Sequence, residues 1–147
     1  MAYQFSLATV LRVRLIREER EERMLMEILR NISQTMVTIA QIERGITQLQ
    51  SSKTKSLSNA VSGHDLQALY ADVDALKQNK RELEEQLEQL EQLRDKQIAV
   101  YRSARREREM LTSMHQHQRA EYAVELLRRE QAMLDDLYGS RRRQITA

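Results

Sequence analysis

SSKTKSLSNAVSG, residues 51–63, is the stretch that decides the fold. It is rich in serine, whose hydroxyl favours turns by bonding to nearby backbone groups, and it lacks the apolar repeat present on either side. Outside it, apolar residues recur at alternating spacings of three and four, which is typical of coiled-coil helices. The sequence therefore predicts two helices, at about residues 7–52 and 63–138, joined by a turn at about 53–62.

The first predicted helix starts just after Ser6, whose hydroxyl can cap the first free backbone amides. Phe5 and Val10 flank this cap at the spacing of a hydrophobic staple. Glutamates at positions 18, 22 and 43 interrupt the apolar seam of the helix. We expect the seam to consist of Leu11, Leu15, Leu25, Leu29, Ile32, Met36, Ile39 and Ile46.

The second predicted helix opens with Ser62 as its cap and Asp65 near the positive end of the helix dipole. One register contains Leu66, Leu69, Val73, Leu76, Leu83, Leu87 and Leu90. A shifted register contains Leu93, Val100, Ala104, Leu111 and Met114, which predicts a stutter near residues 90–93. Gly139 is expected to end the helix, and the arginines after it to form a basic tail over residues 139–147.

Composition supports an all-α fold. Aromatic residues make up 4% of the chain, and there is no proline, tryptophan or cysteine. At 1.5 Å per residue the helices would be about 70 Å and about 115 Å long. The prediction is a single domain over residues 1–147, an antiparallel coiled-coil hairpin with unequal arms. If the arms fold back near residues 57 and 58, residue i faces roughly residue 115 minus i, so the second helix overhangs from about residue 110.

The predicted overhang carries an apolar stripe that has no partner in a simple hairpin. Its members are Ala123, Leu126, Leu127, Met133, Leu134 and Leu137. An uncovered apolar stripe of this kind predicts docking onto a partner protein. The alternative is that the stripe pairs with a second copy of the chain.

The predicted fold-back also brings charges together. It places glutamates 18, 19, 21 and 22 opposite Arg94 and Lys96, which favours antiparallel pairing. Near the open end it sets like charges against each other, namely Arg12, Arg14 and Arg17 against Arg102, Arg105, Arg106 and Arg108. Such a cluster suits an acidic partner surface, although each arginine is equally compatible with a solvated helix face.

The sequence shows no pattern of a catalytic, cofactor or metal site. It has no phosphate-binding glycine loop, no His-Glu-x-x-His and no serine elbow, so we expect no enzyme activity. His115 and His117 point about 200° apart on a helix, which prevents chelation of one metal ion. A net charge of +2 argues against nucleic-acid binding. The lack of any long apolar run argues against a membrane span or signal peptide.

Both ends of the chain resemble one protein family. Residues 3–14, YQFSLATVLRVR, followed by Glu18 and Glu19, are similar to the start of the FliJ flagellar export proteins, with an aromatic residue, spaced leucines, a basic residue and an acidic pair. Residues 128–137, RREQAMLDDL, followed by arginines, resemble the end of that family. The length and the two-helix layout are also similar.

The resemblance implies a cytoplasmic component of the flagellar type III export apparatus, held at the inner face of the cell membrane by its partners. It implies a stalk, similar to the γ subunit of rotary ATPases, inside the hexameric export ATPase. It also implies contact with the cytoplasmic part of the export gate and escort of export chaperones. The candidate partner-binding residues are the basic open end and the overhang: Arg12, Arg14, Arg17, Arg105, Arg106, Arg108, Leu126, Leu127, Arg128, Arg129, Met133, Leu134 and Leu137.

Two other functions fit the same pattern. A homodimeric structural scaffold would also cover the apolar overhang, although unequal arms and a single serine-rich turn argue against it. The equivalent stalk protein of a virulence injectisome would share the architecture, and the terminal residues are what favours the flagellar system.

Overall fold

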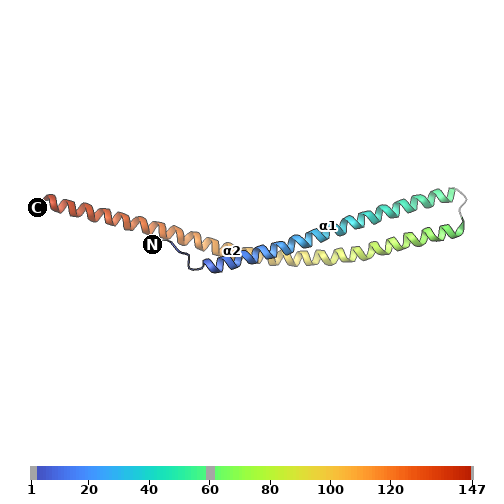
Figure 1. Cartoon of the computed structure of the whole chain (residues 1–147), viewed down its shortest axis with the longest axis horizontal. Helices are drawn as coiled ribbons and strands as arrows, with labels where there is room; N and C mark the ends of the chain where they lie inside the picture. Colours follow the sequence, from blue (N-terminus) through green and yellow to red (C-terminus); the bar gives the residue numbers. More distant parts are fainter. Residues whose placement is uncertain (1–2, 59–61, 147) are drawn as a thin grey trace. The chain divides into compact units, whose positions relative to one another are not determined.

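A computed structural model describes the chain over residues 3–58 and 62–146. These residues form two helices, α1 (Ala8–Ser58) and α2 (Gly63–Thr146), and no strand (Figure 1). Helix α1 has 51 residues and α2 has 84. The predicted all-α fold with two helices of unequal length is therefore confirmed.

Helix α1 is longer than predicted at its C-terminal end. It runs to Ser58, past the expected end near residue 52, so the predicted turn is wrong for residues 53–58. This segment contains neither glycine nor proline, and the Lys53 ammonium lies 3.7 Å from the centre of the Tyr70 ring of α2. That contact, together with the continuing helix backbone, outweighs the turn preference of serine. The rest of the predicted turn includes residues 59–61, which lie outside the described residues.

Helix α2 begins as predicted and ends later. The Ser62 hydroxyl accepts a hydrogen bond from the Asp65 amide at 3.3 Å, which confirms the cap. The helix then continues through Gly139 to Thr146, so the predicted stop near residue 138 and the basic tail outside the helix are wrong for residues 139–146. Gly139 does not adopt a positive φ, and a glycine inside a helix costs only about 1 kcal/mol relative to alanine.

Contacts between α-carbons divide the chain into two units, each of which contains parts of both helices. The terminal unit comprises residues 1–19 and 102–147, and the turn unit comprises residues 20–101. Each unit has its own pairing of α1 with α2. Whether the chain folds as the predicted single domain stays a prediction.

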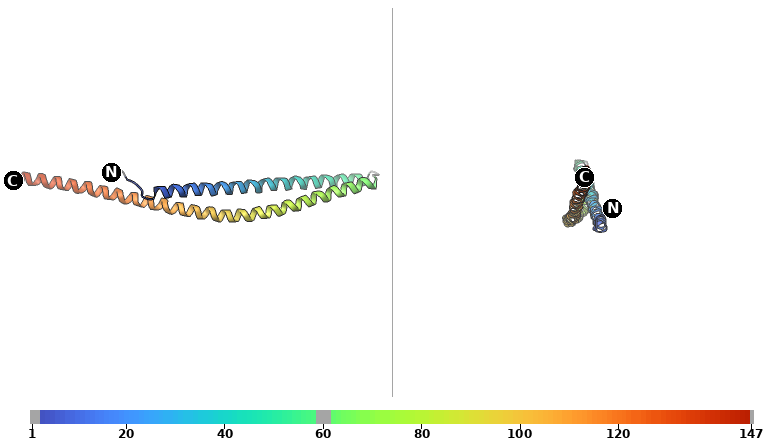
Figure 2. Two further views of the ribbon diagram at one scale, coloured as in Figure 1. Left: turned by 60° about the horizontal axis from the view of Figure 1, so that its bottom comes forward. Right: turned by 90° about the vertical axis from the view of Figure 1, so that its left-hand side faces the viewer.

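The two helices of the turn unit run antiparallel (Figures 1 and 2). The Gln97 side-chain amide donates to the Glu21 carbonyl oxygen at 3.0 Å, Lys80 pairs with Glu43 at 3.2 Å, and Lys53 lies on Tyr70. The residue numbers of contacting pairs thus fall along α2 as they rise along α1, as antiparallel pairing requires. The two numbers of each pair add to about 120. The predicted sum of 115 was too small because α1 continues through the serine-rich stretch.

A heptad seam forms the core of the turn unit. Ile32, Ile39 and Ile46 of α1 are buried at seven-residue intervals, and Val73 of α2 is buried among leucines that repeat in the same way. Two residues predicted for this seam, Leu29 and Met36, are exposed instead. They occupy the position beside the seam, one turn after a core residue, where apolar side chains are half covered.

Helix α2 keeps one register throughout, so the predicted stutter near residues 90–93 is wrong. Leu90, Gln97, Ala104 and Leu111 follow one another at seven-residue spacing, and Gln97 and Ala104 are buried. Of the five residues of the proposed shifted register, Leu93, Val100 and Met114 are 39–50% exposed, whereas Ala104 and Leu111 belong to the seam that continues from Leu90. Because Gln97 is polar and Ala104 is small, the apolar repeat of α2 indicated a shift at residues 90–93 although the seam continues unchanged.

Candidate partner-binding surfaces

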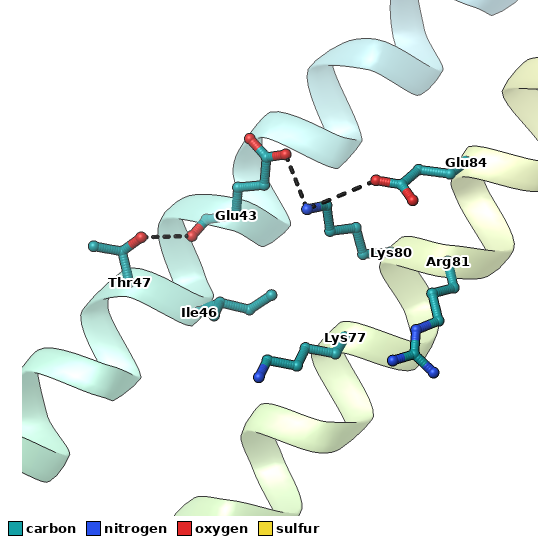
Figure 3. Close-up of a pocket in the computed structure, with 7 residues that line it drawn as sticks. All are labelled: Glu43, Ile46, Thr47, Lys77, Lys80, Arg81 and Glu84. Carbon is teal, nitrogen blue, oxygen red and sulfur yellow. Dashed lines mark hydrogen bonds and ion pairs between the residues drawn. The ribbon is translucent and has the colours of Figure 1, made fainter.

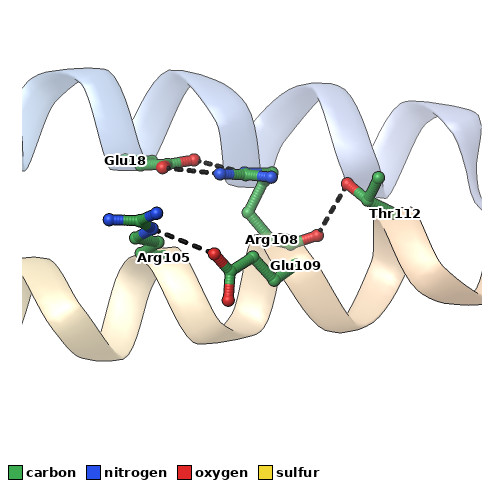
Figure 4. Close-up of polar contacts among 5 residues, drawn as sticks. All are labelled: Glu18, Arg105, Arg108, Glu109 and Thr112. Atoms are coloured by element: carbon green, nitrogen blue, oxygen red, sulfur yellow. Dashed lines mark hydrogen bonds and ion pairs between the residues drawn. The ribbon is translucent and has the colours of Figure 1, made fainter.

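A charged layer lies inside the seam of the terminal unit, where Glu18 of α1 meets Arg108 of α2 (Figure 4). Nε and Nη2 of Arg108 donate to the two carboxylate oxygens of Glu18 at 2.6 and 3.0 Å. Both residues stand at core positions of their heptads, seven residues from Leu11 and His115 respectively. Glu18 is 9% exposed. The bidentate pair therefore replaces an apolar layer of the seam.

The Arg108 guanidinium, through its hydrogen bonds to Glu18, lowers the pKa of that carboxyl below its ordinary value. Burial of Glu18 acts in the opposite direction and raises this pKa, whereas the positive charges of Arg108 and Arg105 lower it further. The net direction is downward because hydrogen bonds and charge together outweigh desolvation.

The lowered pKa of Glu18 predicts a specific loss of stability in acid. Since the folded pKa lies below the ordinary value of 4.5, the stabilisation is fully present above pH 4.5 and is lost as the pH falls through the folded pKa. We expect the stability difference between the native chain and Glu18→Gln to shrink as the pH falls from about 6 to about 3. Urea unfolding at each pH measures this difference. If the free energies of unfolding of the two proteins fell in parallel between about pH 6 and about pH 3, the lowered pKa of Glu18 would be contradicted.

The arginines at the start of α1 meet an acid of α2, not the arginines predicted to face them. Nη1 of Arg14 and Nη1 of Arg17 both donate to one oxygen of Glu107, at 2.6 and 2.9 Å. On α2 itself, Arg105 donates to Glu109 at 2.9 Å. Because the true register differs from the predicted one by several residues, opposite charges meet where like charges were expected.

The six basic candidates of the open end thus fall into two groups. Arg14, Arg17, Arg105 and Arg108 all have carboxylate partners within the terminal unit. Arg12 and Arg106 are exposed and make no side-chain ion pair or hydrogen bond with the described residues. These two side chains are therefore the ones whose charge is available to a partner without breaking a contact of the chain.

Removing one member of the buried pair should cost far more than removing an exposed pair. Arg108→Ala leaves Glu18 without its counter-charge, and we expect the free energy of unfolding to fall by about 3 kcal/mol. The double variant Glu18→Leu/Arg108→Leu should stay within about 1 kcal/mol of the native chain, because an apolar pair fits the seam. Arg129→Ala, which removes an exposed pair with Glu125, should cost less than about 0.5 kcal/mol. Urea unfolding checks all three, and equal losses for the Arg108 and Arg129 variants would refute the prediction.

The two aromatic residues before α1 form a ring cluster with α2 that was not predicted from the sequence. Phe5 is buried with its ring centre 4.5 Å from that of His115, and Tyr3 stacks on His115 at 5.7 Å and meets Tyr122 at 5.3 Å. His115 and Tyr122 stand seven residues apart, at the same core position of two successive α2 heptads. The residues before the helix thus cover the seam as far as Tyr122. The seven-residue spacing of the two rings on α2 was the signal in the sequence that could have predicted this cluster.

Beyond Tyr122, α2 is uncovered. Every residue from 123 to 145 is exposed, apart from Gly139. The predicted candidates Leu126, Leu127, Met133, Leu134 and Leu137 have exposed fractions between 43% and 67%. At 100° per residue eight of the apolar side chains fall within an arc of about 140°, and Val124, which is 49% exposed, lies just outside it. That arc contains Ala123, Leu126, Leu127, Met133, Leu134, Leu137, Tyr138 and Ile145.

The remaining two candidates lie outside the apolar arc of the overhang. Arg129 pairs with Glu125 at 3.3 Å, one turn earlier on the same helix. Arg128 makes no side-chain ion pair or hydrogen bond with the residues that the structure describes. The apolar residues of the overhang thus gather on one face, which also carries Glu130 and Arg141, whereas most of its other charged residues lie outside the arc.

A polar groove in the turn unit was also not predicted. Glu43, Ile46, Thr47, Lys77, Lys80, Arg81 and Glu84 line it (Figure 3). Lys80 bridges Glu43 at 3.2 Å and Glu84 at 3.7 Å. Lys77 and Arg81, one turn apart, make no side-chain ion pair with the described residues. The groove is open to solvent, so it offers surface charge and not an enclosed site.

His115 and His117 both have side-chain contacts in the structure. His115 is in ring contact with Tyr3 and Phe5, and His117 lies 3.1 Å from Glu121 on the same helix. Among the described residues there is no group of three potential ligands that could hold a metal ion. Within the same residues, neither helix has a stretch long and apolar enough to cross a membrane.

Comparison with known protein families gives a match. The family model of the flagellar FliJ protein matches residues 3–144, which is nearly the whole chain and includes both termini that carry the sequence resemblance. Neither the comparison with curated proteins nor the comparison with solved structures gives a match. With the match extending over both helices, this chain belongs to the FliJ family of flagellar proteins.

Proposed function

We propose that this FliJ-family chain is a stalk of the flagellar export ATPase and that the overhang of α2 docks it onto the ATPase ring. Family membership carries the coarser statement: FliJ proteins are non-catalytic components of the flagellar export apparatus. The stalk role and the identity of the partner are the proposal.

The observation that carries the proposal is the uncovered apolar face of α2. Leu127, Leu134 and Leu137 are each more than half exposed on this face. Apolar side chains gathered on one face of a protruding helix mark a site for another protein, because water contact with them is unfavourable. The segment from residue 123 to residue 146 is about 35 Å long, which is enough to pass through a protein layer.

The charges of the terminal unit support the same partner. Arg12 and Arg106 are exposed and unpaired within the described residues, and they lie in the unit from which the overhang extends. Exposed guanidinium groups favour an acidic surface and speed association with it. An acidic lining of the ATPase ring is therefore the complementary surface that the proposal expects.

The remaining roles proposed for the chain concern its other partners. The chain contacts the cytoplasmic part of the export gate and escorts export chaperones. Through these partners it is held in the cytoplasm at the inner face of the cell membrane. The polar groove at Lys77 and Arg81 belongs to the turn unit, whereas the overhang belongs to the terminal unit.

Two measurements on the purified chain test the stalk proposal. Light scattering after size exclusion gives the mass of the chain alone, and a pull-down with the purified export ATPase gives binding. A monomer of 17.4 kDa that binds the ATPase supports the stalk. A stable homodimer without affinity for the ATPase would overturn it and favour a structural scaffold. The ATPase of a virulence injectisome, which should bind more weakly, is the control for the flagellar system.

A further inference from the structure

The terminal unit has a second exposed apolar surface, on the side of its helix pair. It consists of Val10 and Val13 of α1 and Met110 and Met114 of α2, which we call the Val–Met patch. These side chains are 41%, 58%, 66% and 40% exposed. None of them belongs to the heptad seam or to the apolar arc of the overhang.

The four residues lie together because of the antiparallel register. Arg17 and Glu107 meet across the seam at 2.9 Å. Val10 stands seven residues before Arg17, and Met114 stands seven residues after Glu107, so they occupy the next equivalent pair of positions. Val13 is three residues from Val10, and Met110 is four residues from Met114, which places each on the same face as its neighbour. The patch therefore spans both helices.

The charge beside the patch is positive. Arg14 and Arg17 share the single carboxylate of Glu107, which leaves one guanidinium charge in excess. Arg17 follows Val13 by one turn, and Arg106 precedes Met110 by one turn. Arg106 is exposed and has no side-chain ion pair with the described residues. The cations thus stand at one end of the apolar surface.

We propose that the Val–Met patch is a second docking site and that its occupant is an amphipathic helix of another protein, apolar on one face and rich in carboxylates at the end that meets Arg17 and Arg106. An exposed apolar surface that spans two adjacent helices can accept a third helix packed along it. Methionine side chains adapt to partners of different shape, and surplus guanidinium groups select acidic ones. This site goes beyond the docking of the overhang and leaves both the seam and the overhang in place.

Two synthetic helical peptides with the same leucine face, one flanked by glutamate and one by lysine, test the proposal. The probe is the full chain with carbon-13 labelled methionine methyl groups, of which it has seven. We expect the glutamate peptide to shift the Met110 and Met114 signals, with those of Met26 and Met36 unchanged, and to bind at least about tenfold more tightly than the lysine peptide.

Variants separate this site from its alternatives. Met110→Glu should weaken binding of the glutamate peptide about tenfold or more. The control is Met36→Glu, at a methionine of the turn unit that is 56% exposed, and it should leave binding unchanged. Equal binding of the two peptides, shifts confined to Met133 of the overhang, or no shift at about 1 mM peptide would each overturn the proposal. The titration contains no export ATPase, so its failure is distinct from failure of the stalk.

Discussion

Leu127→Asp and Leu134→Asp should each weaken binding of the chain to the export ATPase at least about 30-fold, with no change in its helix content. Both side chains are more than half exposed, so a carboxylate there stays solvated in the free chain and costs little stability. In the complex the same carboxylate would be buried against apolar groups without a partner. Titration calorimetry gives the affinity, and circular dichroism gives the helix content.

The control lies on the other face of the same helix. Ala132→Asp adds the same charge between the two leucines in sequence but points away from the apolar arc, so it should weaken binding less than about threefold. If all three variants weakened binding equally, the effect would be one of charge and the apolar face would not be the docking surface. If none did, the overhang would not be in the interface.

Ile39→Asp should unfold the turn unit or bring it close to unfolding. Ile39 is 9% exposed in the middle of the isoleucine row of α1, so a carboxylate there would be taken out of water. Burying an unpaired charge in place of a core side chain costs about 4 kcal/mol or more, a large part of the total stability of a small domain. Thermal unfolding followed by circular dichroism should show a much lower midpoint and reduced helix content at 25 °C.

Met36→Asp is the matched comparison for that core variant. It lies three residues away on α1 and is 56% exposed, so it should shift the free energy of unfolding by less than about 1 kcal/mol. Equal losses from the two substitutions would show that the seam does not follow the heptad of Ile32, Ile39 and Ile46.

Local signals in the sequence were sufficient for the elements of the fold. Ser62 was identified as a cap from its residue type and the position of Asp65, and its hydrogen bond confirms this. The end of α1 was missed because the serines of residues 51–58 have turn preference, whereas the Lys53 contact with Tyr70 is between residues far apart in the chain. Helix preference cannot show such a contact.

The register required information that apolar periodicity alone does not carry. Gln97 is a buried seam residue, and Glu18 and Arg108 fill a core layer together, so the apolar pattern fades where the seam continues. Reading only apolar residues gave a stutter, and placing the fold-back near residues 57 and 58 gave a pairing shifted by several residues. The uncovered end of α2 followed from the unequal helix lengths and an approximate register, whereas the pairs of Arg14 and Arg17 depended on the exact register and were missed.

The most direct test of the stalk proposal is site-specific cross-linking. The chain has no cysteine, so a single cysteine carries a photoreactive group at one chosen position. A probe at Leu134 should cross-link to the export ATPase, whereas a probe at Ala132 on the opposite face of α2 should do so at least about fivefold less. Cross-links from Leu134 to a second copy of the chain, with none to the ATPase, would contradict the account.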